Sequence, residues 1–149
     1  MPRSSAHDGL TAVAAFTLTG GYSGLDRKTD SQTYDVADPV TAVRVENRGG
    51  AIDIVATDQH TVKVVETYTY SNDKPHTTRS VRDGELTLQA TGCDSTGWFD
   101  HCGGVAYRVE VPRATATHLE NGGGTITVQG LSGAVYAHTG GGTVSVQSD

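Results

Sequence analysis

Three short segments of this chain share one pattern: ENRGGAIDI at residues 46–54, ENGGGTITV at 120–128 and HTGGGTVSV at 138–146. In each, a glycine run is followed by Ile or Val alternating with a polar residue. The last two copies begin 18 residues apart, a spacing that fits one coil of two short strands and two turns. Such coils bury their aliphatic face only by stacking on neighbours. We therefore predict that the first aliphatic residues of the three strands, Ile52, Ile126 and Val144, occupy equivalent positions in stacked layers.

The rest of the chain from residue 40 onward also alternates with a period of two, and it shows no sustained helical period. Alternation places one side of a strand in a core and leaves the other in water. Gly, Asn, Asp or Pro interrupts the pattern at nearly every break. These features predict an all-β fold, a β-solenoid or sandwich-like stacked sheet of glycine-turn repeats.

The glycine runs are best explained as corners, because glycine reaches positive φ without a Cβ clash. A phosphate-binding loop would need a following Lys-Ser/Thr and a helix, which are absent from these segments. A calcium-binding nonapeptide repeat would need an aspartate where two copies carry Thr, and Asp53 is out of register. We expect no cofactor and no metal at these turns.

Composition excludes two function classes. The 149 residues include 19 glycines and carry a formal net charge of −6, with no basic tract for phosphate contacts, so we expect no nucleic-acid partner. No apolar run reaches the roughly 18 residues of a transmembrane helix.

The first residues resemble an export signal. In residues 1–22 a short apolar stretch, LTAVAAFTL at 10–18, precedes small residues. The stretch around Gly20 and Gly21 resembles a bacterial lipoprotein cleavage box, but Tyr22 stands where the lipid-bearing Cys belongs, and a phenol cannot form the thioether. A disordered Ala-rich tail is the alternative. Residues 23–39 are polar and predict a linker, and residues 40–149 form the domain.

Cys93 and Cys102 are the only cysteines, separated by eight residues rich in turn formers. In an exported protein they are expected to form a disulfide. Free thiols are one alternative. A zinc site is the other, although only His101 lies near as a further ligand.

The region after residue 106 resembles a known family. Its motifs are YRVEVP at 107–112, GGTITV at 123–128 and GLSG at 130–133. They resemble the bacterial family of unknown function labelled "putative adhesin", and the segment 41–54 with the cysteine pair is similar to its actinobacterial, lipoprotein-like members. The resemblance covers roughly residues 40–149. It implies a secreted or envelope-attached domain with a β-solenoid or sandwich-like sheet and no established catalysis.

No set of side chains suggests catalysis. Ser132 lies in a turn rather than in a nucleophile elbow between a strand and a helix. Paired carboxylates for glycoside hydrolysis must converge across a cleft. Four acids lie on strand patterns, where we interpret them as solvated outer-face charges: Asp53, Glu66, Glu110 and Glu120.

Glu120 and His138 hold the same position in two successive repeats. Stacking of these repeats would place the carboxylate and the imidazole side by side as a surface ladder pair. A metal site is the alternative, but the sequence offers no third ligand.

The segment Gly97–His101 is the candidate ligand-binding site. It holds the sole Trp of the chain, Trp98, followed by Phe99, Asp100 and His101. Aromatic side chains on a tethered loop stack on sugar rings or fill pockets of a protein partner. The alternative is that Trp98 and Phe99 close one end of the core.

The sequence therefore predicts a non-enzymatic, extracytoplasmic module of the bacterial cell envelope that binds a glycan or a protein. The first alternative is a polysaccharide-active enzyme on a β-solenoid. The second is a self-assembling structural envelope protein, because an uncharged edge strand near residues 143–147 would pair with another copy.

Overall fold

The computed structural model describes residues 10–18, 28–70, 74–92 and 104–148, and within these ranges the chain forms β-strands and no helix. The all-β prediction is confirmed. No helix that could cross a lipid bilayer occurs in these ranges. The strands are β1 (Leu10–Leu18), β2 (Lys28–Val36), β3 (Ala42–Asn47), β4 (Ile52–Thr57), β5 (Val62–Tyr70), β6 (His76–Arg82), β7 (Glu85–Gly92), β8 (Gly104–Pro112), β9 (Ala116–Asn121), β10 (Ile126–Leu131), β11 (Val135–Thr139) and β12 (Val144–Ser148).

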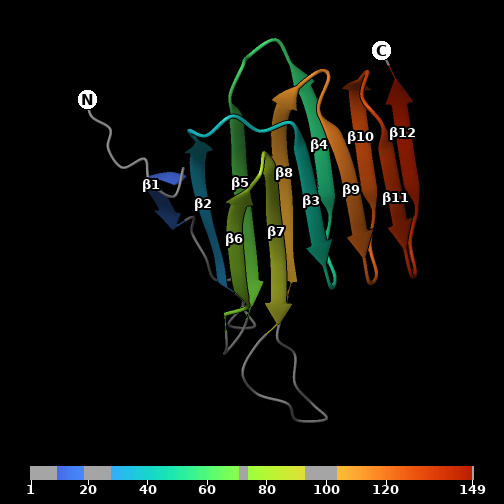
Figure 1. Ribbon diagram of the computed structural model, residues 1–149. Helices are drawn as coiled ribbons and strands as arrows, with labels where there is room; N and C mark the ends of the chain where they lie inside the picture. The colour runs from blue at the N-terminus through green and yellow to red at the C-terminus, as the bar shows by residue number, and fades with distance from the viewer. Residues whose placement is uncertain (1–9, 19–27, 71–73, 93–103, 149) are drawn as a thin grey trace.

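Two mixed sheets face each other across the core (Figure 1). The seven-stranded sheet has the order β1-β2-β5-β8-β4-β10-β12, and the five-stranded sheet has the order β11-β9-β3-β7-β6. Aliphatic side chains from both sheets and tyrosines of the seven-stranded sheet fill the space between them. This arrangement is the sandwich-like class that the alternation predicts.

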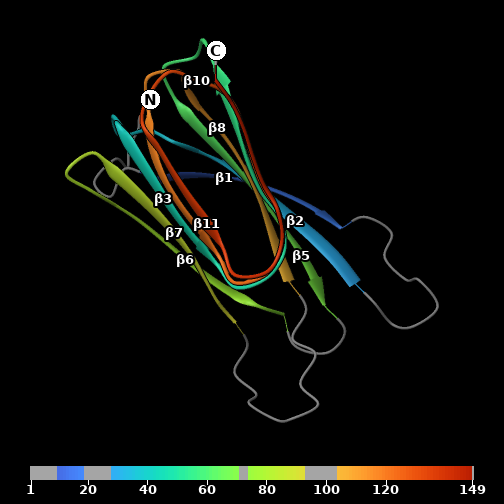
Figure 2. The same ribbon diagram turned by 90° about the vertical axis from the view of Figure 1, so that its right-hand side faces the viewer.

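The three glycine-led segments form three arches, β3–β4, β9–β10 and β11–β12. Each leaves the five-stranded sheet, turns at its glycines and enters the seven-stranded sheet, and in Figure 2 the three turns lie over one another. Ile126 pairs in parallel register with Ile52 on one side and with Val144 on the other. The predicted equivalence of the three positions is confirmed.

The layers do not follow chain order. The β3–β4 arch lies between the β9–β10 arch and the layer formed by β7 and β8. After β4 the chain runs through β5 and β6, which pair antiparallel with β8 and β7. It then returns as β7, which pairs with one side of β3, and continues as β8, which pairs with one side of β4. β9 and β10 pair with the other sides of β3 and β4.

The arches stack closely enough that their turns require glycine. Gly124 has φ +148°, and a Cβ there would overlap the carbonyl oxygen of Gly50 in the next arch. The Gly122 amide donates to the Asn47 carbonyl at 2.9 Å, and the Gly140 amide donates to the Asn121 carbonyl at the same distance. The corner interpretation of these glycines is confirmed.

Asparagine side chains join the turns from inside. Asn47 Nδ2 donates to the Val105 carbonyl and Asn121 Nδ2 to the Gly50 carbonyl, each at 2.7 Å. Both asparagines are buried. Because each amide bonds to a neighbouring layer, the pair ties the stack together in addition to the sheet hydrogen bonds.

Residues 28–36, which the sequence analysis assigns to a polar linker, form β2 instead. This strand pairs antiparallel with β5 over its whole length. Tyr34 and Val36 provide the physical reason, because both are fully buried in the core. Residues 10–18 pair with β2 as β1, so the apolar stretch of the expected export segment forms a strand.

Glu66 corrects the interpretation of the four acids as outer-face charges. It is 1 % exposed, because the alternation of β5 places it on the same inward face as Tyr68. The hydroxyl of Tyr34 donates to its carboxylate at 2.5 Å, that of Thr77 donates at 3.0 Å, and that of Tyr68 donates as well. Burial, together with the neighbouring carboxylate, raises the pKa of the Tyr34 and Tyr68 phenols.

Candidate functional site

The outer face of the five-stranded sheet carries a row of polar side chains that crosses four strands. Because β11, β9, β3 and β7 are parallel and in register, outward residues at one level become neighbours. We call one such row the polar rung; its members, from the edge inward, are His138, Glu120, Glu46 and Gln89.

Hydrogen bonds fix the side chains of Glu46 and Gln89, the inner half of the polar rung. Gln89 Nε2 donates to Glu46 Oε1 at 2.7 Å, and the hydroxyl of Thr78 on β6 donates to Gln89 Oε1 at 3.3 Å. Arg44 lies 3.6 Å from Glu46 and 3.7 Å from Glu85. The half-exposed ion pairs contribute little stability, but together with the amide contacts they orient the Glu46 carboxylate.

The outer half of the polar rung is organised by His118 on β9. Its Nε2 lies 2.8 Å from Glu120 Oε2, and its ring stacks on Tyr136 with centroids 4.4 Å apart. The hydrogen bond from His118 lowers the pKa of the Glu120 carboxyl, with further lowering from the charges of His118, Arg44 and His138. The predicted pairing of Glu120 with His138 across the strands is confirmed as a register pair.

The polar rung lines a shallow groove. One hollow lies among Glu46, Asn47, Glu120 and His138, and a second continues from Glu46 and Asn47 to Gln89. Further lining residues at the turn end of the strands are Arg48, Ala90, Thr91, Asn121, Gly122 and Gly140. Spanning four strands, the groove is about 14 Å long at the usual strand spacing.

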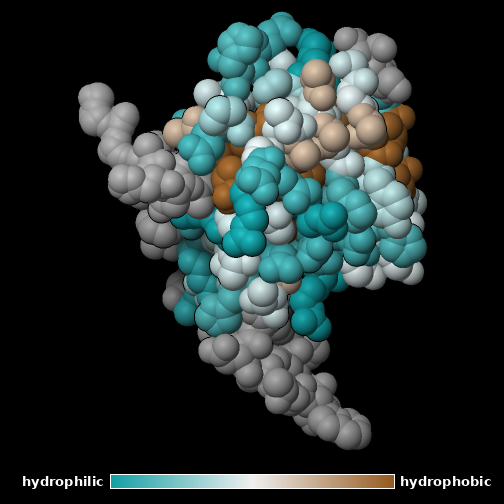
Figure 3. Space-filling view, in the orientation of Figure 1, coloured by the Kyte–Doolittle hydropathy of each residue, from teal (hydrophilic) through white to brown (hydrophobic). Residues whose placement is uncertain are grey.

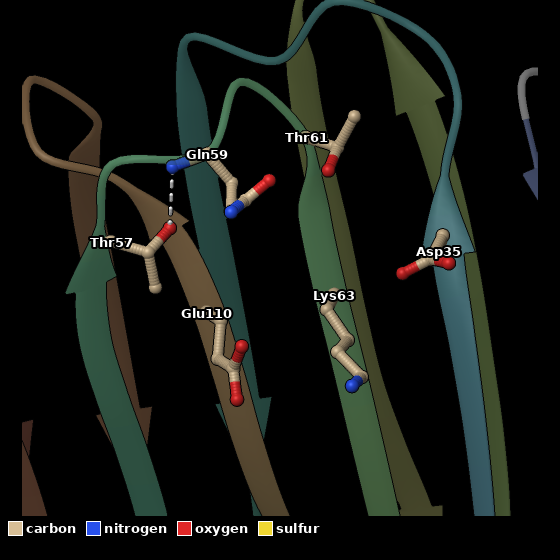
Figure 4. A pocket seen from close by; sticks show the side chains of 6 residues that line it. All are labelled: Asp35, Thr57, Gln59, Thr61, Lys63 and Glu110. Carbon is tan, nitrogen blue, oxygen red and sulfur yellow. Dashed lines mark hydrogen bonds between the residues drawn. The ribbon is translucent and has the colours of Figure 1, made fainter.

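A third hollow lies on the outer face of the seven-stranded sheet (Figure 4). Lys63 on β5 lies between Asp35 on β2 and Glu110 on β8, its register partners. Thr57 accepts a hydrogen bond from the Gln59 amide at 3.2 Å at the upper rim. This hollow places a lysine between two acids, whereas the polar rung contains no Lys or Arg.

The carboxylates named from the sequence do not converge on one cleft. Asp53 and Glu110 lie 3.6 Å and 3.7 Å from the same guanidinium, that of Arg108, on the seven-stranded sheet. Glu66 lies in the core, and Glu120 lies on the opposite outer face. Among the described residues, no three His, Cys, Asp or Glu side chains come together as a metal site requires.

The residues predicted as a ligand site and a disulfide lie outside the described residues. They are Trp98, Phe99, Asp100, His101, Cys93 and Cys102, all between the end of β7 and the start of β8. Their roles therefore stay predictions.

Sequence reasoning missed two members of the polar rung. Glu46 has a signal, since it opens the first glycine-led segment as Glu120 and His138 open the other two. Gln89 has none, because only the pairing of β7 with β3 brings it beside Glu46.

No protein-family profile and no curated protein matches this chain. Among solved structures, it is similar to a "putative adhesin" from Bacteroides fragilis, with 13% identity and a TM-score of 0.53 over 80% of this chain and 53% of that one. It is also similar to a "putative cell adhesion protein" from Clostridium sporogenes, with 12% identity and a TM-score of 0.47 over 82% of this chain and 100% of that one. A "putative adhesin" from Parabacteroides distasonis has 18% identity and a TM-score of 0.47 over 84% of this chain and 60% of that one.

The chain therefore spans about half of the Bacteroides fragilis structure. At 13% identity, that likeness shows a common fold. It agrees with the arrangement of two facing sheets described above.

Proposed function

We propose that this chain is a non-enzymatic adhesion module of the bacterial cell envelope, and that it binds a glycan through the groove of the polar rung. The observation that carries the proposal is the continuous row of His138, Glu120, Glu46 and Gln89 along that groove. The names of the structures that share its fold agree with an adhesive role.

The chemistry of the groove favours an uncharged or amino-bearing glycan. Ionised carboxylates accept hydrogen bonds only, and sugar hydroxyl, acetamido and ammonium groups donate them. Two carboxylates, Glu46 and Glu120, stand in the polar rung itself, which contains no Lys or Arg. Arg44 lies beside Glu46, and Arg48 lines the turn end of the groove. A uronic-acid carboxylate would face Glu46 and Glu120, which in their ionised form have no hydrogen to donate to it.

Location outside the cytoplasm and pairing of Cys93 with Cys102 belong to the same proposal. The export-like residues 1–22 and the two cysteines support it. Comparing the mass of the alkylated chain with and without prior reduction tests the disulfide; equal masses would contradict it. The aromatic segment of Trp98 and Phe99 is proposed as a second contact for the ligand.

The stacked arches are proposed to be a short β-solenoid, extended at one end by antiparallel strands. The parallel register of β4, β10 and β12 supports this description. A polysaccharide-active enzyme is not favoured by any arrangement of acids in the described residues. Incubation with envelope polysaccharides is expected to release no reducing ends, and release by the purified chain would overturn the non-enzymatic assignment.

Binding by a set of oligosaccharides tests the proposal. By calorimetry, an N-acetylhexosamine oligomer and its deacetylated form are expected to bind, and a uronic-acid oligomer is not. Changing Glu46→Gln and Glu120→Gln together should weaken binding about tenfold or more, since each substitution removes a charged hydrogen-bond acceptor worth about 1.5–3 kcal/mol.

The matched control is Asp53→Asn with Glu110→Gln, which removes two carboxylates from the other sheet and should leave binding unchanged. Equal losses from both pairs of substitutions would show that net charge, not the groove, governs binding. Failure of every oligosaccharide to bind would overturn the proposed function.

A further inference from the structure

β6 (His76–Arg82) is an edge strand in the middle of the chain. It ends the five-stranded sheet, where it pairs antiparallel with β7, and no described residue pairs with its other side. On that side the seven-stranded sheet continues past β5 with β2 and β1, which lie to the left of β6 in Figure 1. A strand added to β6 would therefore meet unpaired backbone N–H and C=O groups and would lie against the extended sheet.

β6 is basic, although the chain as a whole has a net charge of −6. Its sequence, HTTRSVR, holds Arg79 and Arg82 and no Asp or Glu. Within the described part of the chain, neither arginine forms an ion pair with a carboxylate. In Figure 3, which shows the five-stranded sheet from outside, the surface over β6 and β7 is mainly hydrophilic. These features favour an acidic partner at this edge over an apolar one.

Arg79 points inward from the edge strand. The alternation of β6 leaves Thr77, Arg79 and Val81 partly buried and exposes the other four residues. The Cζ atom of Arg79 lies 3.9 Å from the centroid of the Tyr34 ring, which is fully buried. An inward-pointing charge on an edge opposes pairing with an apolar strand. A strand that presents a carboxylate at this position would give the guanidinium a charged hydrogen-bond partner.

We propose that β6 binds an extended acidic segment of a protein partner by strand addition, with a carboxylate of that segment facing Arg79. Backbone hydrogen bonds to the free edge supply affinity, and the carboxylate supplies selectivity. A second copy of β6 does not fit this role. Arg79 is the central residue of the strand, so symmetric antiparallel pairing in full register would place it opposite its own copy.

Two capped and fluorescently labelled peptides, EVTETTE and EVTQTTE, test the proposal. In antiparallel pairing with β6 in full register, the central residue of each peptide lies opposite Arg79. By fluorescence anisotropy, EVTETTE is expected to bind saturably. EVTQTTE should bind about tenfold more weakly, because a neutral amide replaces the charged acceptor that faces the guanidinium.

A substitution in the chain tests the same contact from the other side. Arg79→Gln should weaken the binding of EVTETTE about tenfold and leave that of EVTQTTE nearly unchanged. The matched control, Arg108→Gln, removes the same charge from the outer face of the seven-stranded sheet and should change neither affinity. Because Arg79 packs against Tyr34, thermal unfolding of both variants shows whether they are folded.

Hydrogen exchange of the unmodified chain locates the bound peptide, and we expect EVTETTE to protect the amides of β6. Four outcomes would overturn the proposal: no saturable binding, equal binding of the two peptides, equal losses from the two arginine substitutions, or binding without protection of β6. If Arg79→Gln fails to fold, the two peptides and the exchange of β6 in the unmodified chain decide. Glycan binding by the groove is measured separately, so failure here leaves the proposed function standing.

Discussion

At the scale of single residues, the buried carboxylate of Glu66 is the most consequential polar group in the core. A buried charge is tolerated only when hydrogen-bond donors replace the water it has lost. Here the donors are hydroxyls from three strands: Tyr34, Tyr68 and Thr77. Tyr107 lies in the same core, and its hydroxyl has no partner among the described residues.

This contrast predicts different effects on the free energy of unfolding for two Tyr→Phe substitutions. Tyr34→Phe removes a donor to a buried carboxylate and should lower the free energy of unfolding by about 1.5–3 kcal/mol. Tyr107→Phe removes an unpaired buried hydroxyl and should be neutral or stabilising. Urea unfolding of the two variants measures both, and a larger loss from Tyr107→Phe would contradict the described network.

Glu120 gives a prediction about pH. Because the hydrogen bond from His118 favours the ionised carboxylate, its pKa in the folded chain lies below the ordinary value of 4.5. The contact therefore stabilises the fold above that value and is lost as the pH falls through the lowered pKa. NMR titration of the Glu120 carboxyl should show the lowered midpoint, and His118→Ala should move it upward. A midpoint at or above the ordinary value in the unmodified chain would contradict the contact.

At the scale of the elements, the glycine turns set the spacing of the arches. A side chain at Gly124 would meet the Gly50 carbonyl of the next arch, whereas one at Gly141 would meet nothing within 4 Å. The two residues lie in equivalent turns, so they form a matched pair.

Gly124→Ala should lower the free energy of unfolding by more than about 1 kcal/mol, because it adds both a clash and a strained positive φ. Gly141→Ala should have little effect. Thermal unfolding of the two variants tests the stacking. Equal stabilities would show that the arches are farther apart than described.

The elements also show how far sequence reasoning reaches. The repeated segments predicted that Ile52, Ile126 and Val144 align, because a periodic pattern encodes which residues face the core. The repeated pattern could not predict that the β3–β4 arch lies between the β9–β10 arch and the layer of β7 and β8, because alternation does not encode which strands pair. The alternation of β5 does place Glu66 on the inward face with Tyr68. The donor Tyr34, which helps a carboxylate to be buried there, lies 32 residues away on another strand, and alternation does not predict that contact.

The candidate site was predicted only in part. The repeats place Glu120 beside His138, and the same logic extends to Glu46. Gln89 joins them only through the pairing of β7 with β3, and the two adjoining hollows along the row depend on the turn ends of all these strands. A groove of this kind forms only in the assembled sheet, so no local sequence motif predicts it.

At the scale of the whole molecule, the inner and outer faces of the two sheets have different roles. Their inner faces form the core, and the outer face of the five-stranded sheet presents the polar rung. The groove of the polar rung on that outer face is the proposed contact for a glycan.

Chemical-shift mapping of the labelled chain during titration with an N-acetylhexosamine oligomer tests this contact. The largest shifts are expected at Glu46, Gln89, Glu120 and His138 and in the adjoining turns. Little change is expected around Asp53 and Glu110 on the opposite face. Saturable binding whose shifts cluster on the seven-stranded sheet, with the polar rung unmoved, would contradict it.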